Sequence, residues 1–372
     1  MIKIVSSILL FLFAASLSTF AQSLPPRFPR SVPVTEWRKR IPRDNPLTAE
    51  KIKLGADLYF DRRLSADGSV SCATCHDPAS AFTDHNTTAF GVANSRGTRN
   101  APTVLNAMFS PTLFWDGRAR SLEEQAKQPL VNAAEMGMRD YDDVVARIAN
   151  VPDYAQRFRR VFKSEVTIDA IVQAIAAYER TQLSGDAPFD RFIAGDRNAI
   201  SALQKRGWDL FRGKAQCIEC HAFSPSSPFF TDFDFHNTGA AAKTQKLEPL
   251  SQAVRAGNIS ALAHREGTSD LGRYLVTGKQ SDIGAFKTPT LRDIELTAPY
   301  MHDGSQKTLL DVVRFYSRGG EANSYLDRRM RVLNLSDEEM NALVEFMRSL
   351  TSDEVLHRAQ TTRPQTRTTS NH

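Results

Sequence analysis

All four cysteines of the 372-residue chain lie in two short patterns of the same form. The patterns are Cys72-Ala-Thr-Cys75-His76 and Cys217-Ile-Glu-Cys220-His221. This spacing is typical of covalent attachment of c-type haem, in which both thiols bond to haem vinyl groups and the histidine binds the iron. A disulfide, a redox dithiol or a zinc site would leave the two paired histidines unexplained. We therefore predict two haem c groups, attached at Cys72, Cys75 and His76 and at Cys217, Cys220 and His221.

A duplicated order of short sequence elements surrounds these two patterns. Residues 55–58 read Gly-Ala-Asp-Leu before the first pattern, and residues 207–210 read Gly-Trp-Asp-Leu before the second. Phe-Thr-Asp follows each pattern, at residues 82–84 and 230–232. The same order of elements twice predicts two copies of one small domain.

Helical periodicity recurs along the chain, whereas strand-like alternation is scarce. One predicted helix face is formed by Ile168, Ile171, Val172 and Ile175. Ser336-x-x-Glu339 is a capping box that begins another helix. We therefore expect a mainly α fold of two tandem c-type cytochrome domains, 22–185 and 186–352, each with one covalent haem c.

Residues 1–21 have the three parts of a secretory signal peptide. Lys3 is followed by an apolar run from Ile4 to Leu17 and by small residues up to Ala21. The run is shorter than the about 20 residues that span a bilayer, although a signal anchor is the alternative. We expect cleavage after Ala21, which predicts a periplasmic protein with no membrane span after cleavage.

The two ends of the mature chain lack helical periodicity. Residues 22–46 are rich in Pro and Arg and predict an extended arm, and residues 353–372 predict a flexible tail. The 47 Lys and Arg residues against 42 Asp and Glu residues give a formal charge of +5. This charge is too slight to indicate nucleic acid, but it permits an acidic partner.

Several other segments have distinctive sequences in a fixed order along the chain. They are residues 100–107 (NAPTVLNA), 114–119 (FWDGRA), 123–125 (EEQ), Pro129, 135–136 (EM), 287–292 (KTPTLR) and 297–304 (TAPYMHDG). Together with the two haem patterns, they resemble the bacterial di-haem cytochrome c peroxidase and MauG superfamily. The resemblance covers residues 47–350.

The resemblance implies that the haem on His76 reacts with hydrogen peroxide, with Gln125 and Glu135 on its open face. Heterolytic cleavage of peroxide moves a proton from one oxygen to the other, and a glutamate can carry it. Trp115 matches a tryptophan that lies between the two haems of the family and passes electrons. Without the resemblance, Glu135 would be interpreted as a solvated residue and Trp115 as a core aromatic.

Asn100, Thr297 and Pro299 match positions that hold a calcium ion between the domains of the family. Calcium accepts amide and carbonyl oxygens, so neutral residues can bind it when water completes the shell. The resemblance therefore implies a calcium ion beside the two haems. By themselves these three residues are typical of turns.

The sequence departs from the simpler peroxidases in the loop after the first haem. Those enzymes have a histidine there that blocks the iron, and the matching position here is Val92. Valine cannot bind iron, so we expect an open first haem in the ferric state. His85, in the same loop, is the alternative ligand, although a lone loop histidine is usually solvated.

The second departure concerns the second haem, where simpler peroxidases have a methionine ligand. The matching position is Tyr316, as in MauG-type enzymes. Leu309, Val312, Val313 and Tyr316 follow helical spacing, which also fits an ordinary buried tyrosine. Met330 or Met301 would then be the alternative ligand. A phenolate stabilises high-valent iron, whereas a thioether raises the reduction potential.

The expected function is that of a peroxidase that passes oxidising power from the first haem through Trp115 to a second haem with Tyr316 as ligand. Electrons would come from a small c-type cytochrome or a cupredoxin. The alternative is MauG-like oxidation of Trp or Tyr in a partner protein. MauG has a surface Trp where this chain has Ala215, so maturation of methylamine dehydrogenase is doubtful. A plain di-haem electron carrier is the rival from another class, but it leaves Glu135 and Gln125 without a role.

Overall fold

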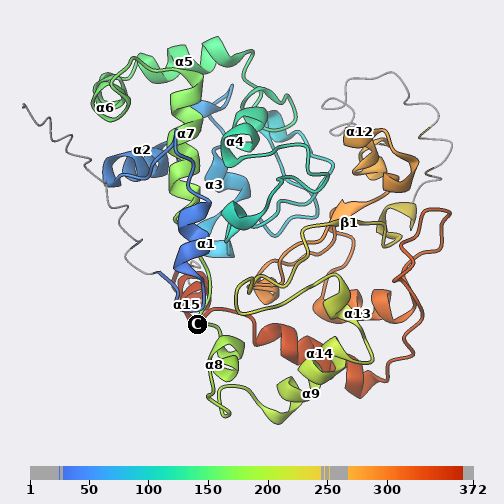
Figure 1. Ribbon diagram of the computed structural model, residues 1–372. Coiled ribbons are helices and arrows are strands. Elements are labelled where there is room, and N and C mark those ends of the chain that lie inside the picture. Colours follow the sequence, from blue (N-terminus) through green and yellow to red (C-terminus); the bar gives the residue numbers. More distant parts are fainter. Residues whose placement is uncertain (1–24, 26–27, 244–246, 248–250, 252–266, 363–372) are drawn as a thin grey trace, which may run out of the picture.

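The computed structural model describes residues 25, 28–243, 247, 251 and 267–362 (Figure 1). The expected signal peptide therefore lies outside the described residues. The helices are α1 (Val34–Lys39), α2 (Ala49–Tyr59), α3 (Cys72–Cys75), α4 (Leu122–Val131), α5 (Tyr141–Ala149), α6 (Pro152–Phe162), α7 (Ile168–Glu179), α8 (Pro188–Ile193), α9 (Ala202–Arg212), α12 (Tyr274–Thr277), α13 (Leu309–Ser317), α14 (Asp337–Arg348) and α15 (Asp353–Thr362). Strands β1 (Phe235–His236) and β2 (Phe286–Lys287) form one short antiparallel pair. The expected mainly α class is confirmed.

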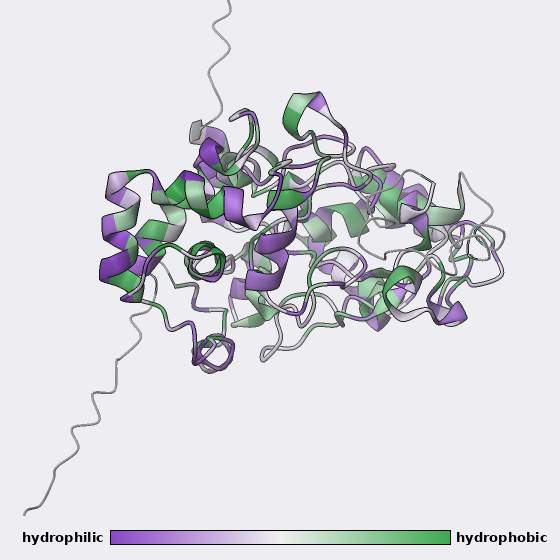
Figure 2. Ribbon diagram, turned by 90° about the horizontal axis from the view of Figure 1, so that it is seen from above, coloured by the Kyte–Doolittle hydropathy of each residue, from purple (hydrophilic) through white to green (hydrophobic). Residues whose placement is uncertain are grey.

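Most of the longer helices begin at side-chain caps. Thr48 accepts from the backbone N–H of Lys51 at the start of α2, and Thr167 accepts from that of Ala170 at the start of α7. Ser336 and Glu339 form the predicted capping box of α14. The helices contain both hydrophobic and hydrophilic residues (Figure 2), as expected where one face of a helix packs on a core.

Two groups of elements lie side by side in Figure 1: a first lobe, formed by the chain from α1 to α7, and a second lobe, formed by the chain from α8 to α14. In the first lobe α2 packs on α7, and in the second lobe α9 packs on α14. Both pairs depend on a glycine, because a Cβ on Gly55 would lie 1.8 Å from Ala174 O and one on Gly207 would lie 1.9 Å from Ala342 O. The same close helix contact at a glycine in both lobes confirms the duplication that the sequence predicts.

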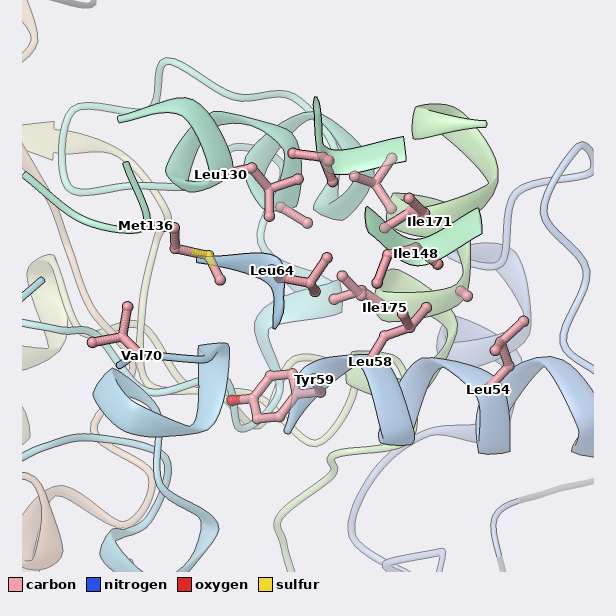
Figure 3. Packing of buried hydrophobic residues seen from close by; sticks show 14 of the residues in the cluster. Leu54, Leu58, Tyr59, Leu64, Val70, Leu130, Met136, Ile148, Ile171 and Ile175 are labelled. Carbon is pink, nitrogen blue, oxygen red and sulfur yellow. The ribbon is translucent and has the colours of Figure 1, made fainter. Parts of the chain in front are cut away.

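Each lobe has its own hydrophobic core. The first core gathers Leu54, Leu58, Tyr59, Ile171 and Ile175 between α2 and α7 (Figure 3). In the second core the same place is taken by aromatic residues of α8, α9 and α14: Phe189, Phe211 and Phe346. These cores support the segments that contain the two Cys-x-x-Cys-His patterns.

Both ends of the described chain differ from the sequence-based expectation. The predicted arm contains α1, whose Trp37 is fully buried and donates its indole N–H to Arg180 O. The predicted flexible tail begins with α15, which packs against residues 78–80, with Val355 in the core of the first lobe. In both cases a few apolar side chains find a core that the local sequence does not reveal. Residues 363–372 lie outside the described part.

None of the helices described by the structure is long and apolar enough to cross a membrane.

Candidate active site

The first Cys-x-x-Cys-His pattern lines a cavity in the first lobe. Cys72 and Cys75 are the two ends of α3, a single helical turn, so both sulfurs lie on the same side of the chain. The backbone N–H of His76 donates to Cys72 O at 2.9 Å, which continues the turn and brings the imidazole to the same cavity. One turn therefore presents both attachment sulfurs and the iron ligand.

The orientation of the His76 ring favours metal binding through Nε2. Its Nδ1 lies 3.3 Å from Phe82 O, a carbonyl that accepts the Nδ1 proton. Burial lowers the pKa of His76, which favours the neutral ring that can bind a metal. A ligating histidine usually donates its other ring N–H in this way.

The second pattern repeats this geometry in the second lobe. His221 Nδ1 lies 2.9 Å from Phe230 O, and burial lowers the pKa of His221. Cys217, Cys220 and His221 line a second cavity, of about 310 Å³ against about 170 Å³ for the first. The phenylalanines that accept from the two histidines belong to the duplicated Phe-Thr-Asp segments.

The structure brings Gln125 and Glu135 to the first cavity, beside His76. Gln125 is on α4, and Glu135 follows in a loop where its backbone N–H donates to Asn132 O at 3.0 Å. Burial raises the pKa of Glu135, and the charge of Arg118 opposes this rise. A carboxyl group with a raised pKa in an enclosed cavity can both accept and return a proton.

Two segments separate the cavities, because residues 100–103 and 113–115 line both of them. Trp115 belongs to the second segment. Its indole N–H donates to Asn100 O at 2.9 Å, and its carbonyl accepts from the backbone N–H of Lys287 at 2.8 Å. The indole therefore lies between the two haem motifs, held by both lobes.

A group of buried charges lies beside these two segments, which form the wall between the cavities. Asp116 is completely buried and binds Arg99 at 2.6 Å and Arg118 at 2.9 Å, so two guanidinium groups share one carboxylate. Arg99 Nε is buried and has no hydrogen-bond partner among the described residues. Both arginines line the first cavity, and their excess positive charge fits the anionic propionates of a haem. The donor set and the charge of the cavity thus agree with haem c.

Tyr316, on α13, lines the second cavity with His221. Burial raises the pKa of Tyr316, so the phenol stays protonated unless a cation such as iron binds its oxygen. Met301 and Met330, the alternative ligands, line the same cavity. All three candidates are therefore brought to the second haem motif.

The loop after the first haem motif places Val92 and His85 differently. Val92 is buried, and its backbone N–H donates to Glu135 O at 2.8 Å, so it helps to hold the loop that contains the glutamate. His85 is exposed, and its Nδ1 lies 3.0 Å from Ala298 O in the second lobe. Within the described residues His85 is absent from the lining of the first cavity.

Asn100, Thr297 and Pro299, the expected calcium ligands, all line the second cavity. The amide nitrogen of Asn100 donates to Asn86 O at 2.8 Å, which fixes the orientation of the side-chain amide. This arrangement fits a calcium site of neutral oxygens, although calcium itself stays a prediction.

Sequence reasoning missed a charged cluster at the edge of the second haem motif. His236 lies 2.7 Å from Asp327 and 2.9 Å from Asp232, and Arg329 Nη1 lies 3.8 Å from Cys220 Sγ. Burial lowers the pKa of His236, but its hydrogen bonds outweigh this effect and raise it to about 10. The Phe-Thr-Asp duplication pointed to Asp232, but no local pattern linked it to Asp327.

Sequence reasoning also missed Arg99, Lys287 and Arg273, which surround the Trp115 loop. Lys287 lies in the recognised KTPTLR segment, so the motif itself was a signal for it. Arg99 and Arg273 have no such signal, because their partners are distant in the sequence.

Comparisons with known proteins agree with this geometry. A family model described as di-haem cytochrome c peroxidase matches residues 49–198. The methylamine utilization protein MauG of Methylorubrum extorquens is 41% identical over 331 residues, which are 88% of this chain and 83% of that protein. Cytochrome-c peroxidase IdrP1 of Pseudomonas sp. is 37% identical over 325 residues, 85% of this chain and 84% of that protein.

A solved structure extends the likeness to the fold of the whole chain. It is the crystal structure of a MauG-like protein associated with microbial copper homeostasis, with a TM-score of 0.73 and 30% sequence identity. The match covers 91% of this chain and 99% of that one. The expected family and the peroxide-using oxidoreductase class are confirmed. The chain belongs to the di-haem cytochrome c peroxidase family, which includes MauG.

Proposed function

We propose that the first haem motif reduces hydrogen peroxide to water and that Trp115 passes the oxidising power to the second haem motif. The observation that carries this proposal is the position of Trp115 on the wall shared by both cavities, with Glu135 and Gln125 in the first of them. The overall reaction takes one peroxide, two protons and two electrons to two waters. Haem iron, when bound by His76, supplies the electrons that cleave the O–O bond.

The side chains of the first cavity handle the protons. Glu135 takes the proton from one peroxide oxygen and gives it to the oxygen that leaves as water. Gln125 orients the peroxide by hydrogen bonding, and Arg118 supports the carboxylate form of Glu135. His76 donates its Nδ1 proton to Phe82 O, which leaves Nε2 as the nitrogen that would bind the haem iron.

At the second motif, His221 and Tyr316 are the residues that would hold the haem iron. A phenolate lowers the reduction potential relative to a thioether and so lets the second site hold an oxidising equivalent. Val92 leaves the first site without a blocking side chain from that position, which favours reaction in the ferric state. We place the mature protein in the periplasm and assign Asn100, Thr297 and Pro299 to a calcium ion.

The test is a stoichiometric peroxide titration of the fully ferric holoprotein, followed by optical and EPR spectroscopy. Immediate loss of both ferric signals is the expected result. Reaction only after one electron has been added would contradict the roles of Val92 and Tyr316 and would indicate a peroxidase with a closed first haem.

A second candidate is oxidation of a Trp or Tyr side chain in a partner protein, which is the role that the resemblance to MauG implies. The Tyr316 position favours it, because two stored oxidising equivalents can act on a distant side chain. The position of the surface Trp of MauG is Ala215 here, and Ala215 is buried. The nearby Trp208 packs on Phe211 with ring centroids 5.9 Å apart. Mass spectrometry of partner proteins trapped under peroxide tests this role, and unmodified partners would exclude it.

A further inference from the structure

The loop that contains Trp115 is held by the second lobe through side chains as well as backbone. Lys287 Nζ donates to Ser110 Oγ at 2.8 Å and to Thr112 O at 2.5 Å. Arg273 Nη1 donates to Asp116 O at 2.9 Å and to Gly117 O at 3.0 Å. Two cations from the second lobe therefore bind the loop on either side of the indole.

Lys287 makes a further contact that is specific to the indole-bearing residue. Its own backbone N–H donates to Trp115 O, so one residue binds the loop at three places. A partly buried ammonium needs such partners, because an unpaired one would be costly. Burial lowers the pKa of Lys287 to about 8, so its ammonium depends on these acceptors. The three contacts tie three points of one loop to one strand.

The strand that provides Lys287 is itself part of the second haem site. In β2, Lys287 pairs with Phe235 and Phe286 pairs with His236 of β1. His236 belongs to the charged cluster beside Cys220. A path through the two short paired strands therefore runs from the second haem motif to the backbone of Trp115, while Asn100 of the first lobe holds the indole N–H.

We propose that Lys287 is a positioning residue for transfer between the haems, because it fixes the Trp115 loop to the second haem site. The inference rests on the proposed role of Trp115. It assigns to Lys287 no contact with peroxide, so the reaction at the first haem does not depend on it. Loss of Lys287 should slow only the transfer of oxidising power to the second haem.

The test uses the ferric holoprotein, one equivalent of hydrogen peroxide and freeze-quench EPR, which follows the ferric signals of the two haems separately. In Lys287→Met, the first signal should disappear at the wild-type rate. The second should disappear more slowly than in the wild type, because the loop that carries the indole is no longer held at Ser110 and Thr112. Lys287→Arg, which keeps a cationic donor, should restore most of the rate.

Lys127→Met is the control, because it also removes an ammonium group, one that forms an ion pair with Asp169 at 3.0 Å on α4, while Lys127 is outside the linings of both cavities. Its two signals should behave as in the wild type. If Lys287→Met fails to fold, Ser110→Ala removes one acceptor of the ammonium and should slow the second signal in the same direction.

Two outcomes would overturn the inference. Loss of both signals at wild-type rates in Lys287→Met and in Ser110→Ala would show that the contact does not position the bridge. Equal slowing of both signals would instead place Lys287 in the chemistry of the first haem. A wild-type protein that does not react with peroxide would contradict the proposed function itself, which keeps the two failures distinct.

Discussion

The hydroxyl of Tyr59 donates a 2.8 Å hydrogen bond to the carbonyl of His76, so the core of the first lobe is joined directly to the histidine of the first haem motif. Tyr59 is fully buried at the end of α2 (Figure 3), and its ring lies 5.0 Å from that of Tyr178. The hydrogen bond between Tyr59 and His76 therefore links the packing of α2 to the first haem motif.

Tyr59→Phe should lower the free energy of unfolding by about 1–3 kcal/mol, because it leaves the His76 carbonyl without this donor. Urea unfolding of the holoprotein measures the change. Tyr178→Phe, a change of the same kind in the neighbouring ring, serves as the control and should cost less. Equal losses in the two variants would mean that the bond to His76 contributes nothing of its own.

Glu135→Gln should slow the reaction of the first haem with peroxide by about 10²–10⁴-fold, the usual contribution of a general acid–base group. Stopped-flow optical spectroscopy measures the rate. Glu124→Gln, at an exposed position of α4, is the control and should leave it unchanged. A Glu135→Gln rate equal to that of the wild type would remove Glu135 from the mechanism.

The pH dependence of this rate follows from the same carboxyl group. Burial raises the pKa of Glu135 above its ordinary value of 4.5, and peroxide must give its proton to the ionised form. The rate should therefore fall as the pH drops through that raised pKa, and the Glu135→Gln variant should not show this fall. A pH profile that is the same in both proteins would assign the titration to another group.

Tyr316→Met should raise the reduction potential of the second haem, because a thioether favours ferrous iron. The rise should be on the order of 100 mV, within the about 0.8 V over which axial ligands act. Spectroelectrochemical titration measures it, with Tyr274→Phe as a control, since Tyr274 lies on α12 outside the second cavity. An unchanged potential would favour Met301 or Met330 as the ligand.

Local patterns predicted the features that depend on neighbouring residues. The Cys-x-x-Cys-His spacing, the Ser336 capping box and the face of α7 are all set within a few residues, and the structure has them as expected. The duplication was visible because Gly55 and Gly207 each permit the same close helix contact.

Features that depend on distant partners could not be predicted in this way. The α15 helix is polar enough to resemble a tail, and its burial depends on its contacts with residues 78–80 and with the core of the first lobe. Likewise the three contacts of Lys287 join residues about 170 positions apart in the sequence, so no spacing rule could identify them. Only the folded chain brings these groups together.

Gly55→Ala should destabilise the first lobe by about 1–3 kcal/mol, because its Cβ would meet the backbone oxygen of Ala174 and force α2 away from α7. Thermal unfolding followed by circular dichroism measures the loss. Gly97→Ala is the matched control, since its Cβ would lie 3.4 Å from the nearest atom, Ala89 O, an ordinary contact. A Gly55→Ala protein as stable as Gly97→Ala would contradict the close helix approach.

Asp116→Asn should lower the free energy of unfolding at pH 7 by about 3–5 kcal/mol, because it leaves two buried guanidinium groups without their carboxylate. Urea unfolding measures this loss. Asp169→Asn, at an exposed ion pair, is the control and should cost about 0–1 kcal/mol.

The effect of Asp116 should also depend on pH in a definite direction. Burial opposes ionisation of this carboxyl, but Arg99 and Arg118 outweigh it and lower the pKa below its ordinary value of 3.8. A lowered pKa in the folded state means that the stabilisation is present above the unfolded value and is lost as the pH falls through the folded one. The difference in unfolding free energy between wild type and Asp116→Asn should therefore shrink once the pH is taken below 3.8. A difference that stays constant through this range would show that the pairing of Asp116 with the two arginines is not what stabilises the wall between the cavities.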